Sequence, residues 1–177
     1  FSLYMEMLDE AVTAIREGRA PDFDQTESAH AEVDLKIPAL IPNDYLNDVP
    51  LRLQLYKRIS SATSAELLSE IEIEMIDRFG LLPTKVKNLF EQAKIRLVAE
   101  SLGIRQITLG PQSGRIEFLE KTKVDPTILI SLVQCHPDEY KLDGATALKI
   151  FRETVGTEAR FGFIYEVLDA LKRPTTK

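Results

Sequence analysis

The chain has 177 residues, of which 44% are hydrophobic and 28% charged, and its formal net charge is −6. This composition is typical of a globular protein with a sizeable core. The acidic balance disfavours a nucleic-acid backbone as partner, because phosphate contacts depend on clustered Lys and Arg. No apolar run approaches the roughly 20 residues that span a bilayer, and no secretory signal opens the chain. The one cysteine, Cys135, excludes an internal disulfide. We therefore expect a cytoplasmic protein that contacts neither membranes nor, directly, nucleic acid.

The beginning of the chain is predicted to belong to a neighbouring module. Apolar residues recur at helical spacing from Phe1 to Ile15, and Gly18 is a plausible stop. A polar connector with Pro21 follows. Because the chain starts inside an amphipathic helix rather than with Met, we expect it to be cut from a longer protein. The expected segments are an upstream module's last helix and linker, one main domain and a tail, at residues 1–25, 26–173 and 174–177.

The main domain is predicted to open with a strand, a loop and a helix. Residues 31–37 alternate between apolar and charged side chains, which predicts a half-buried strand. Residues 38–50 carry three prolines together with Asn and Asp, which predicts a loop. Asp48 is placed to cap the next helix, with Pro50 in its first turn, and that helix is expected to run to about Ser60.

The segment EIEIEMIDRFG, residues 70–80, has the two-residue period of a strand, but its surroundings predict a helix. A capping box spans Thr63 to Glu66, in which the Thr63 side chain is expected to accept from the backbone and Glu66 to reach back and bond reciprocally. Gly80 followed by Pro83 is an equally clear stop. Between these signals, one apolar stripe follows helical spacing and is expected to face the core: Leu67, Leu68, Ile71, Met75 and Phe79.

The remaining sequence predicts three helices and two antiparallel hairpins. A long helix is expected from Pro83 to about Leu102. Its basic residues are interpreted as a solvated face in preference to a weak anion site: Lys85, Lys87, Lys94 and Arg96. Later elements are a hairpin of IRQITL and RIEFLE, a helix from Asp125-Pro126 to Cys135, a hairpin of EYKLDG and TALKIFRE, and a closing helix at 158–172. This order predicts an α+β fold, a single domain in which antiparallel β-hairpins pack with several amphipathic helices.

The helix around EIEIE carries a crowded row of acids. Projected at about 100° per residue, its side face holds Glu66, Glu70, Glu74 and Asp77, with Ile73 among them. Like charges four residues apart cost about 0.2–0.5 kcal/mol per pair. Two interpretations stay open. The face is either solvated, with basic residues of the preceding helix neutralising part of it, or it is a docking surface whose acids meet Arg or Lys of a partner around one apolar anchor.

Residue patterns for catalysis or metal binding are scarce. The sequence has no Walker-type phosphate loop, no G-x-G-x-x-G motif and no serine elbow. His30 and His136 have no triad or zinc spacing, and the adjacency of Cys135 and His136 does not by itself make a nucleophile and base pair. We therefore expect no catalytic residue, no cofactor and no metal in this chain. An interaction module is favoured, and the alternative is a small cytosolic hydrolase or transferase that works with carboxylates.

Two long segments carry a resemblance to a known family. FSLYMEMLDEAV at the start and LIPNDYLNDVPLRLQLYKRISSATSAELLSEIEIEMIDRFGLLP at 40–83 resemble the C-terminal region of the bacterial transcription-repair coupling factors, the Mfd family. LGIRQI, IEFLEK, YKLDG and ALKIF are similar too, so the resemblance covers essentially the whole chain. The opening helix resembles the end of that family's DNA-translocase motor, which is related to RecG. Residues from about 26 onward resemble its terminal regulatory domain.

The resemblance implies a function that spacing alone does not. Members are ATP-driven DNA translocases that displace RNA polymerase stalled at a lesion and recruit the excision-repair protein UvrA, and their sites for ATP and Mg²⁺ lie upstream in the motor. The terminal domain is implied to be an autoinhibitory clamp, which docks on the protein's own N-terminal UvrB-like module and hides the surface that binds UvrA. By this resemblance Glu74, Asp77 and Arg78 are contact residues, and helix geometry adds Glu70 and Ile73.

Overall fold

The computed structural model describes Val12 and residues 31–172 of the chain. The predicted opening helix, apart from Val12, lies outside the described residues, as do the linker and the tail. The predicted limits of the main domain at residues 26 and 173 fall there too, so they stay predictions.

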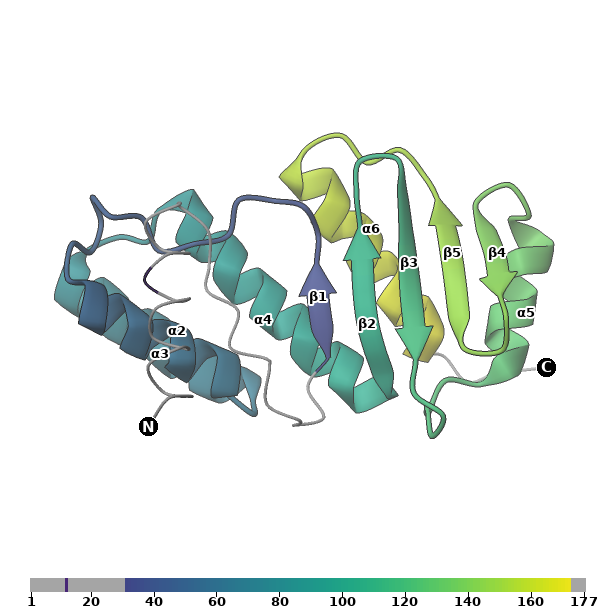
Figure 1. The fold of residues 1–177 in the computed structure, drawn as a ribbon, viewed down its shortest axis with the longest axis horizontal. Coiled ribbons are helices and arrows are strands. Elements are labelled where there is room, and N and C mark those ends of the chain that lie inside the picture. The colour runs from purple at the N-terminus through teal and green to yellow at the C-terminus, as the bar shows by residue number, and fades with distance from the viewer. Residues whose placement is uncertain (1–11, 13–30, 173–177) are drawn as a thin grey trace. The chain divides into compact units, whose positions relative to one another are not determined.

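The described residues form five helices and one five-stranded sheet (Figure 1). The strands have the order β1-β2-β3-β5-β4 in the sheet, and the expected α+β class with two antiparallel hairpins is confirmed. No helix in this part of the chain is long and apolar enough to cross a bilayer. In chain order the elements are β1 (Glu32–Asp34), α2 (Val49–Ser61), α3 (Ala65–Phe79), α4 (Thr84–Leu102), β2 (Ile104–Leu109), β3 (Ser113–Phe118), α5 (Pro126–Cys135), β4 (Tyr140–Asp143), β5 (Ala147–Phe151) and α6 (Thr157–Lys172).

The chain is organised as two compact units. The first includes Pro38–Lys94, with α2, α3 and the beginning of α4. The second includes the described residues up to Ile37 and those from Ile95 onward, with the sheet, α5, α6 and the end of α4. The chain therefore leaves the second unit after β1 and returns to it along α4.

Two helix boundaries in the first unit follow the sequence signals. The Asp48 side chain accepts a hydrogen bond of 3.2 Å from the Leu51 backbone N–H at the start of α2, with Pro50 in the first turn. Gly80 ends α3 with a φ of 95°, a left-handed conformation that glycine adopts without a steric penalty. Both predictions are confirmed.

The start of α3 differs from the prediction. Ser64, not Thr63, is the N-cap, and its hydroxyl accepts a hydrogen bond of 3.2 Å from the backbone N–H of Leu67. The cap therefore lies one residue later than expected. Glu66 then falls at the second helical position, whereas a capping box needs the acid at the third. The predicted reciprocal bond from Glu66 was wrong.

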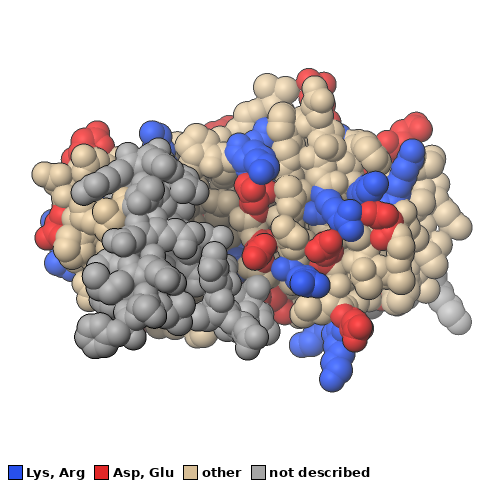
Figure 2. All heavy atoms as spheres, in the orientation of Figure 1, with Lys and Arg blue, Asp and Glu red and all other residues tan. Residues whose placement is uncertain are grey.

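The sheet of the second unit buries one face. Ile107, Leu109 and Ile116 are fully buried in a core that also takes residues from α4, α5 and α6. In Figure 1, α6 passes behind β2 and β3. Figure 2 shows Lys, Arg, Asp and Glu side chains mixed over the face of these strands that is turned to the viewer. One packed and one solvated face is the usual arrangement of a mainly antiparallel sheet.

Strand β1 is shorter than the predicted strand over 31–37 and pairs differently from the hairpins. Only Glu32–Asp34 is strand, and it runs parallel to β2, with Val33 opposite Ile107. The early end has a local cause, because Lys36 takes a φ of 54° and leaves the extended conformation. Its backbone N–H donates to the Asp34 carboxylate at 3.1 Å. The predicted alternation of burial nevertheless continues to Ile37, since Leu35 is fully buried, Lys36 is exposed and Ile37 packs against the core.

A buried arginine, Arg160 of α6, joins three segments of the second unit. Its guanidinium donates to the carbonyl oxygens of Leu35 at 2.9 Å and Lys36 at 3.0 Å, at the end of β1. It also donates to the hydroxyl of Thr154 at 3.2 Å and to its carbonyl at 3.0 Å. Thr154 in turn donates to the carbonyls of Gly110 and Pro111 in the β2–β3 turn. Arg160 thus supplies donors to carbonyls that would otherwise be buried without partners.

Replacing Arg160 should therefore destabilise the chain strongly. We expect Arg160→Met to lower the free energy of unfolding by about 3 kcal/mol, because it leaves several buried carbonyls unsatisfied. Urea denaturation followed by circular dichroism measures this. Arg105→Met on β2 is the matched control, since Arg105 is exposed, and it should change stability by less than about 0.5 kcal/mol. Equal effects of the two substitutions would contradict the role given to Arg160.

Candidate interaction surface

Helix α3 is held in the first unit by the apolar stripe predicted from its sequence. Leu68, Ile71 and Met75 are buried, and Phe79 is half-buried. Leu67 is the exception. Its side chain is 42% exposed, because the next residue, Leu68, takes the core-facing position in the first turn. The core side of α3 is therefore confirmed except at Leu67.

The C-terminal end of α3 is fixed by Tyr45, from the loop before α2. The Tyr45 hydroxyl lies 2.9 Å from the carbonyl oxygen of Gly80 and 3.3 Å from that of Met75. Its ring meets the Phe79 ring edge-on, with the ring centroids 6.1 Å apart. The Gly80 carbonyl follows the end of α3 and has no donor within the helix, so the Tyr45 hydroxyl satisfies a group that α3 itself cannot.

The loop that carries Tyr45 is itself anchored on α2. Arg52 is 3% exposed and donates to the Asn43 side chain at 2.6 Å and to the Leu46 carbonyl at 2.8 Å. The backbone N–H of Ile41 donates to the Tyr56 hydroxyl at 2.7 Å, and burial raises the pKa of Tyr56 above its usual value. The proline-rich segment before α2 is thus an ordered support for α3.

Three of the five predicted contact residues lie together on the outer side of α3. Ile73 is 60% exposed, and Glu70 and Asp77 are exposed beside it. Neither carboxylate forms an ion pair with any residue that the structure describes. We call Glu70, Ile73 and Asp77 the α3 outer face.

The other two predicted contact residues, Glu74 and Arg78, are engaged within the first unit. The Glu74 carboxylate pairs with the guanidinium of Arg58 on α2, and lies 3.6 Å from that of Arg78, one turn further along α3. The Arg78 guanidinium also lies 5.0 Å from the centre of the Phe79 ring. The interpretation that a basic residue of the preceding helix neutralises part of the acidic row is therefore correct at Glu74, and does not extend to the α3 outer face.

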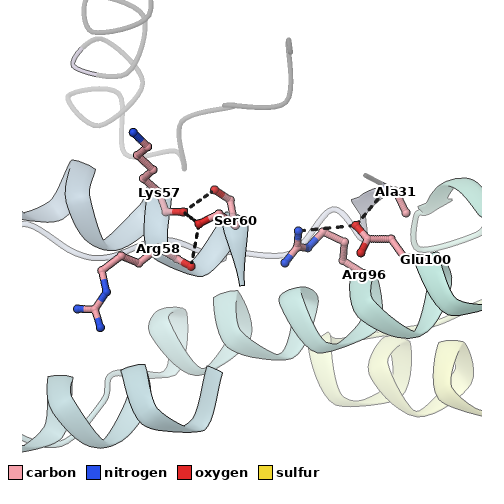
Figure 3. A network of polar contacts seen from close by, with 7 residues as sticks. Ala31, Lys57, Arg58, Ser60, Arg96 and Glu100 are labelled. Atoms are coloured by element: carbon pink, nitrogen blue, oxygen red, sulfur yellow. Dashed lines mark hydrogen bonds and ion pairs between the residues drawn. The ribbon is translucent and has the colours of Figure 1, made fainter. Parts of the chain in front are cut away.

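Helix α2 ends in two serines whose hydroxyls bond back to the last turn of the helix. The hydroxyls of Ser60 and Ser61 donate to the carbonyl oxygen of Lys57 at 3.1 and 2.7 Å (Figure 3). In Figure 3 the charged ends of Lys57 and Arg58 point in different directions. Only Arg58 reaches Glu74, so one basic residue of α2 is committed to α3.

Two exposed apolar residues beside the α3 outer face were not predicted. Ile76 is 39% exposed, and Leu81, just after the helix, is 86% exposed. The sequence did contain a signal for Leu81, because it follows the glycine that turns the chain out of the helix. Ile76, three residues after Ile73 on the same helix, gives the outer part of α3 a second exposed apolar side chain.

The solvated face expected for the basic residues of α4 is correct at Lys85 and Lys87, which are exposed, and wrong at Lys94 and Arg96. Lys94 pairs with Glu72 of α3 at 3.5 Å and with Glu91 at 3.4 Å. Arg96 is 7% exposed and lies 3.7 Å from Glu100, whose carboxylate also accepts from the Ala31 backbone N–H at 3.3 Å (Figure 3). The charge of Arg96 is therefore used inside the second unit, in its pair with Glu100.

Chemical groups for a metal site are not assembled in the described residues. They contain no cluster of three or more His, Cys, Asp or Glu side chains that could hold a metal ion. Cys135 is exposed, and the neighbouring His136 packs edge-on against Tyr140, with ring centroids 6.2 Å apart. The feature of the first unit with the clearest capacity to act is therefore the α3 outer face, which offers two carboxylates around an apolar side chain.

Comparison with known proteins gives consistent matches. The family model described as TRCF domain matches residues 35–129. The chain is 44% identical over 168 residues to the transcription-repair-coupling factor of Haemophilus influenzae, which covers 95% of this chain and 15% of that protein. It is 42% identical over 172 residues to the Escherichia coli protein of the same name, with 97% of this chain and 15% of that protein covered. The chain thus spans about 15% of the length of these relatives.

A solved structure matches the fold. It is described as the crystal structure of the C-terminal domain of a transcription-repair coupling factor, and it superposes with a TM-score of 0.62 at 19% sequence identity. The match covers 81% of this chain and 95% of the other. At this identity the likeness supports the arrangement of helices and strands, and it leaves the role of individual residues to be argued from the surface itself.

The pairing of Arg58 with Glu74 can be tested by reversing the charges. We expect Arg58→Glu and Glu74→Arg each to lower the free energy of unfolding by about 0.5–1 kcal/mol, because each places like charges together at a half-exposed site. The double variant should recover part of that loss. Chemical denaturation of the four proteins gives the coupling energy. Strictly additive losses would show that the two side chains do not interact in solution.

Proposed function

The chain belongs to the TRCF domain family, and on that premise we propose that it is a regulatory domain of a transcription-repair-coupling factor. The whole protein would be an ATP-dependent DNA translocase that removes stalled RNA polymerase at DNA lesions and recruits nucleotide excision repair. The domain itself would be non-catalytic, with ATP and Mg²⁺ bound in a motor elsewhere in the protein. The similarity over 95–97% of the chain to two proteins named for this role supports the proposal.

The domain would act by docking on the protein's own N-terminal UvrB-like module, where it would mask the surface that binds UvrA. One observation carries this part of the proposal. Glu70 and Asp77 have no cationic partner among the described residues, and they flank Ile73, which is 60% exposed. A helix that leaves two acids unpaired around an apolar residue gains most from a partner that brings Arg or Lys and a pocket for the apolar side chain.

Each side chain of this surface would have a distinct part in docking. Ile73, with Leu81 beside the end of the helix, would supply the apolar area that is removed from water. Glu70 and Asp77 would set the orientation, since complementary charges favour one register over others. Glu74 and Arg78 already balance each other at the rim, so they would contribute less than the unpaired acids.

The direct test is binding between this chain and the separately produced UvrB-like module, measured by isothermal titration calorimetry. We expect Glu70→Arg and Asp77→Arg each to weaken binding about tenfold, because each would meet a basic partner surface with a like charge. Glu120→Arg makes the same charge change on an exposed residue of the second unit and should leave binding unchanged. Melting temperatures of all variants confirm that the fold is intact. If the Glu70→Arg, Asp77→Arg and Glu120→Arg variants bind the module with equal affinity, the α3 outer face is a solvated surface and not a docking site.

The regulatory consequence is tested in the full-length protein. An intramolecular lock worth about 2–3 kcal/mol lowers the apparent affinity of a competing partner roughly 30–150-fold. We therefore expect Asp77→Arg to tighten UvrA binding, by up to that factor, whereas Glu120→Arg should not change it. Surface plasmon resonance with immobilised UvrA measures the effect. If Asp77→Arg weakens binding to the separate module but does not raise the affinity of the full-length protein for UvrA, the domain docks on the module without masking the UvrA-binding surface.

A further inference from the structure

The sheet of the second unit ends at β4, and helix α5 packs against this strand. The strand order ends with β4, so only β5 pairs with it among the strands that the structure describes (Figure 1). The strand is four residues long, and Leu142 at its centre is 47% exposed. An edge strand presents main-chain groups that can pair with another strand.

The hydrogen-bond pattern shows which main-chain groups β4 offers. The N–H of Phe151 donates to the carbonyl of Glu139 at 2.6 Å, so these opposite residues form a hydrogen-bonded pair. Antiparallel strands alternate between hydrogen-bonded and non-hydrogen-bonded pairs. By this alternation Lys141 and Asp143 bond to β5, whereas Leu142 does not. The N–H and C=O of Leu142 therefore point away from β5.

The charges that flank Leu142 have opposite sign and lie on the other face of the strand from its side chain. Lys141 is exposed, and its ammonium lies 5.5 Å from the centre of the Phe151 ring. Asp143 pairs with Arg115 of β3 at 2.7 Å, and the Asp143 side chain is still 38% exposed. The edge strand thus carries Lys141, Leu142 and Asp143 in succession. Its central residue, Leu142, has a main-chain donor and a main-chain acceptor that point away from β5.

We propose that β4 pairs with β4 of a second copy of this chain, antiparallel and with the two-fold axis at Leu142. In this register Lys141 of each copy lies opposite Asp143 of the other, and the two Leu142 residues exchange two main-chain hydrogen bonds. Shifting the antiparallel register by two residues places Lys141 of one copy opposite Lys141 of the other, or Asp143 of one copy opposite Asp143 of the other. Like charges directly opposite each other are destabilising. Parallel pairing in register would also place Lys141 beside Lys141 of the other copy and Asp143 beside Asp143. The pattern Lys-Leu-Asp is therefore complementary to itself in one arrangement.

The expected association is weak, because a strand of four residues makes a small interface. A dissociation constant of about 10⁻⁴ M fits an interface of this class. The contact continues the sheet across the two copies and uses no residue of the α3 outer face. It is therefore independent of the docking proposed above, and either proposal can fail without the other.

Sedimentation equilibrium of the chain over a range of concentrations tests the proposal. We expect the unchanged chain to approach a dimer at the highest concentrations, and Lys141→Glu and Asp143→Lys each to weaken dimerisation about tenfold or more, because each creates two like-charge pairs. An equimolar mixture of these two variants should dimerise again, since the introduced Glu then faces the introduced Lys, and Asp143 of one copy faces Lys141 of the other. A chain that stays monomeric throughout overturns the proposal, as does a mixture that associates no better than its components.

Two further variants separate strand pairing from other modes of association. Leu142→Pro removes the outward N–H while keeping the bonds to β5, which an edge position tolerates, and it should abolish the dimer. Lys123→Glu makes the same charge change as Lys141→Glu at an exposed residue away from the edge, and it should leave the dimer intact. Melting temperatures identify any variant that fails to fold, and in that case the mixing experiment still decides. Equal dimerisation of Lys141→Glu and Lys123→Glu would place the contact elsewhere and refute the pairing.

Discussion

The hydrogen bond from the Tyr45 hydroxyl to the carbonyl of Gly80, with the Met75 carbonyl also within reach, fixes the way α3 lies at the surface of the first unit. It holds the end of the helix against a loop that is anchored in turn by Arg52 and Tyr56. A helix fixed at this end and by its buried stripe cannot rotate about its axis. Glu70, Ile73 and Asp77 are therefore presented as a set, and a partner does not have to order them. Such preorganisation lowers the entropy that binding must overcome.

The charges on α3 divide into two groups with different physical roles. Glu74, Arg58 and Arg78 satisfy one another, and half-exposed pairs of this kind contribute about 0–1 kcal/mol to stability. The unpaired acids, Glu70 and Asp77, gain nothing from the fold and repel each other slightly. Their small cost is consistent with a role outside the folded domain. The five residues predicted as contacts thus differ in their surroundings, because Glu74 and Arg78 have ionic partners within the first unit and Glu70 and Asp77 have none among the described residues.

Most local structure could be predicted because its causes lie within a few residues. Asp48 and Asp125 cap helices by accepting from backbone N–H groups two or three residues ahead, and Gly80 ends α3 through its own φ. The predictions that failed depended on distinctions of a single residue or on distant partners. Ser64 and Thr63 are equivalent caps by type, so sequence could not choose between them. Likewise, nothing local indicates that β1 pairs in parallel with a strand some seventy residues later.

The sequence by itself determined the α+β class, the core stripe of α3 and the candidate face, because periodicity specifies which side of an element is apolar. Tertiary structure alone decided which charges on that face are available. Arg58 and Glu74 meet only when α2 packs beside α3, and Arg96 is drawn into the second unit beside Glu100. The same holds for Arg160, whose acceptors lie at Leu35 and Thr154. A charged side chain finds its partner through the fold, and the helical projection carries no information about the neighbouring elements.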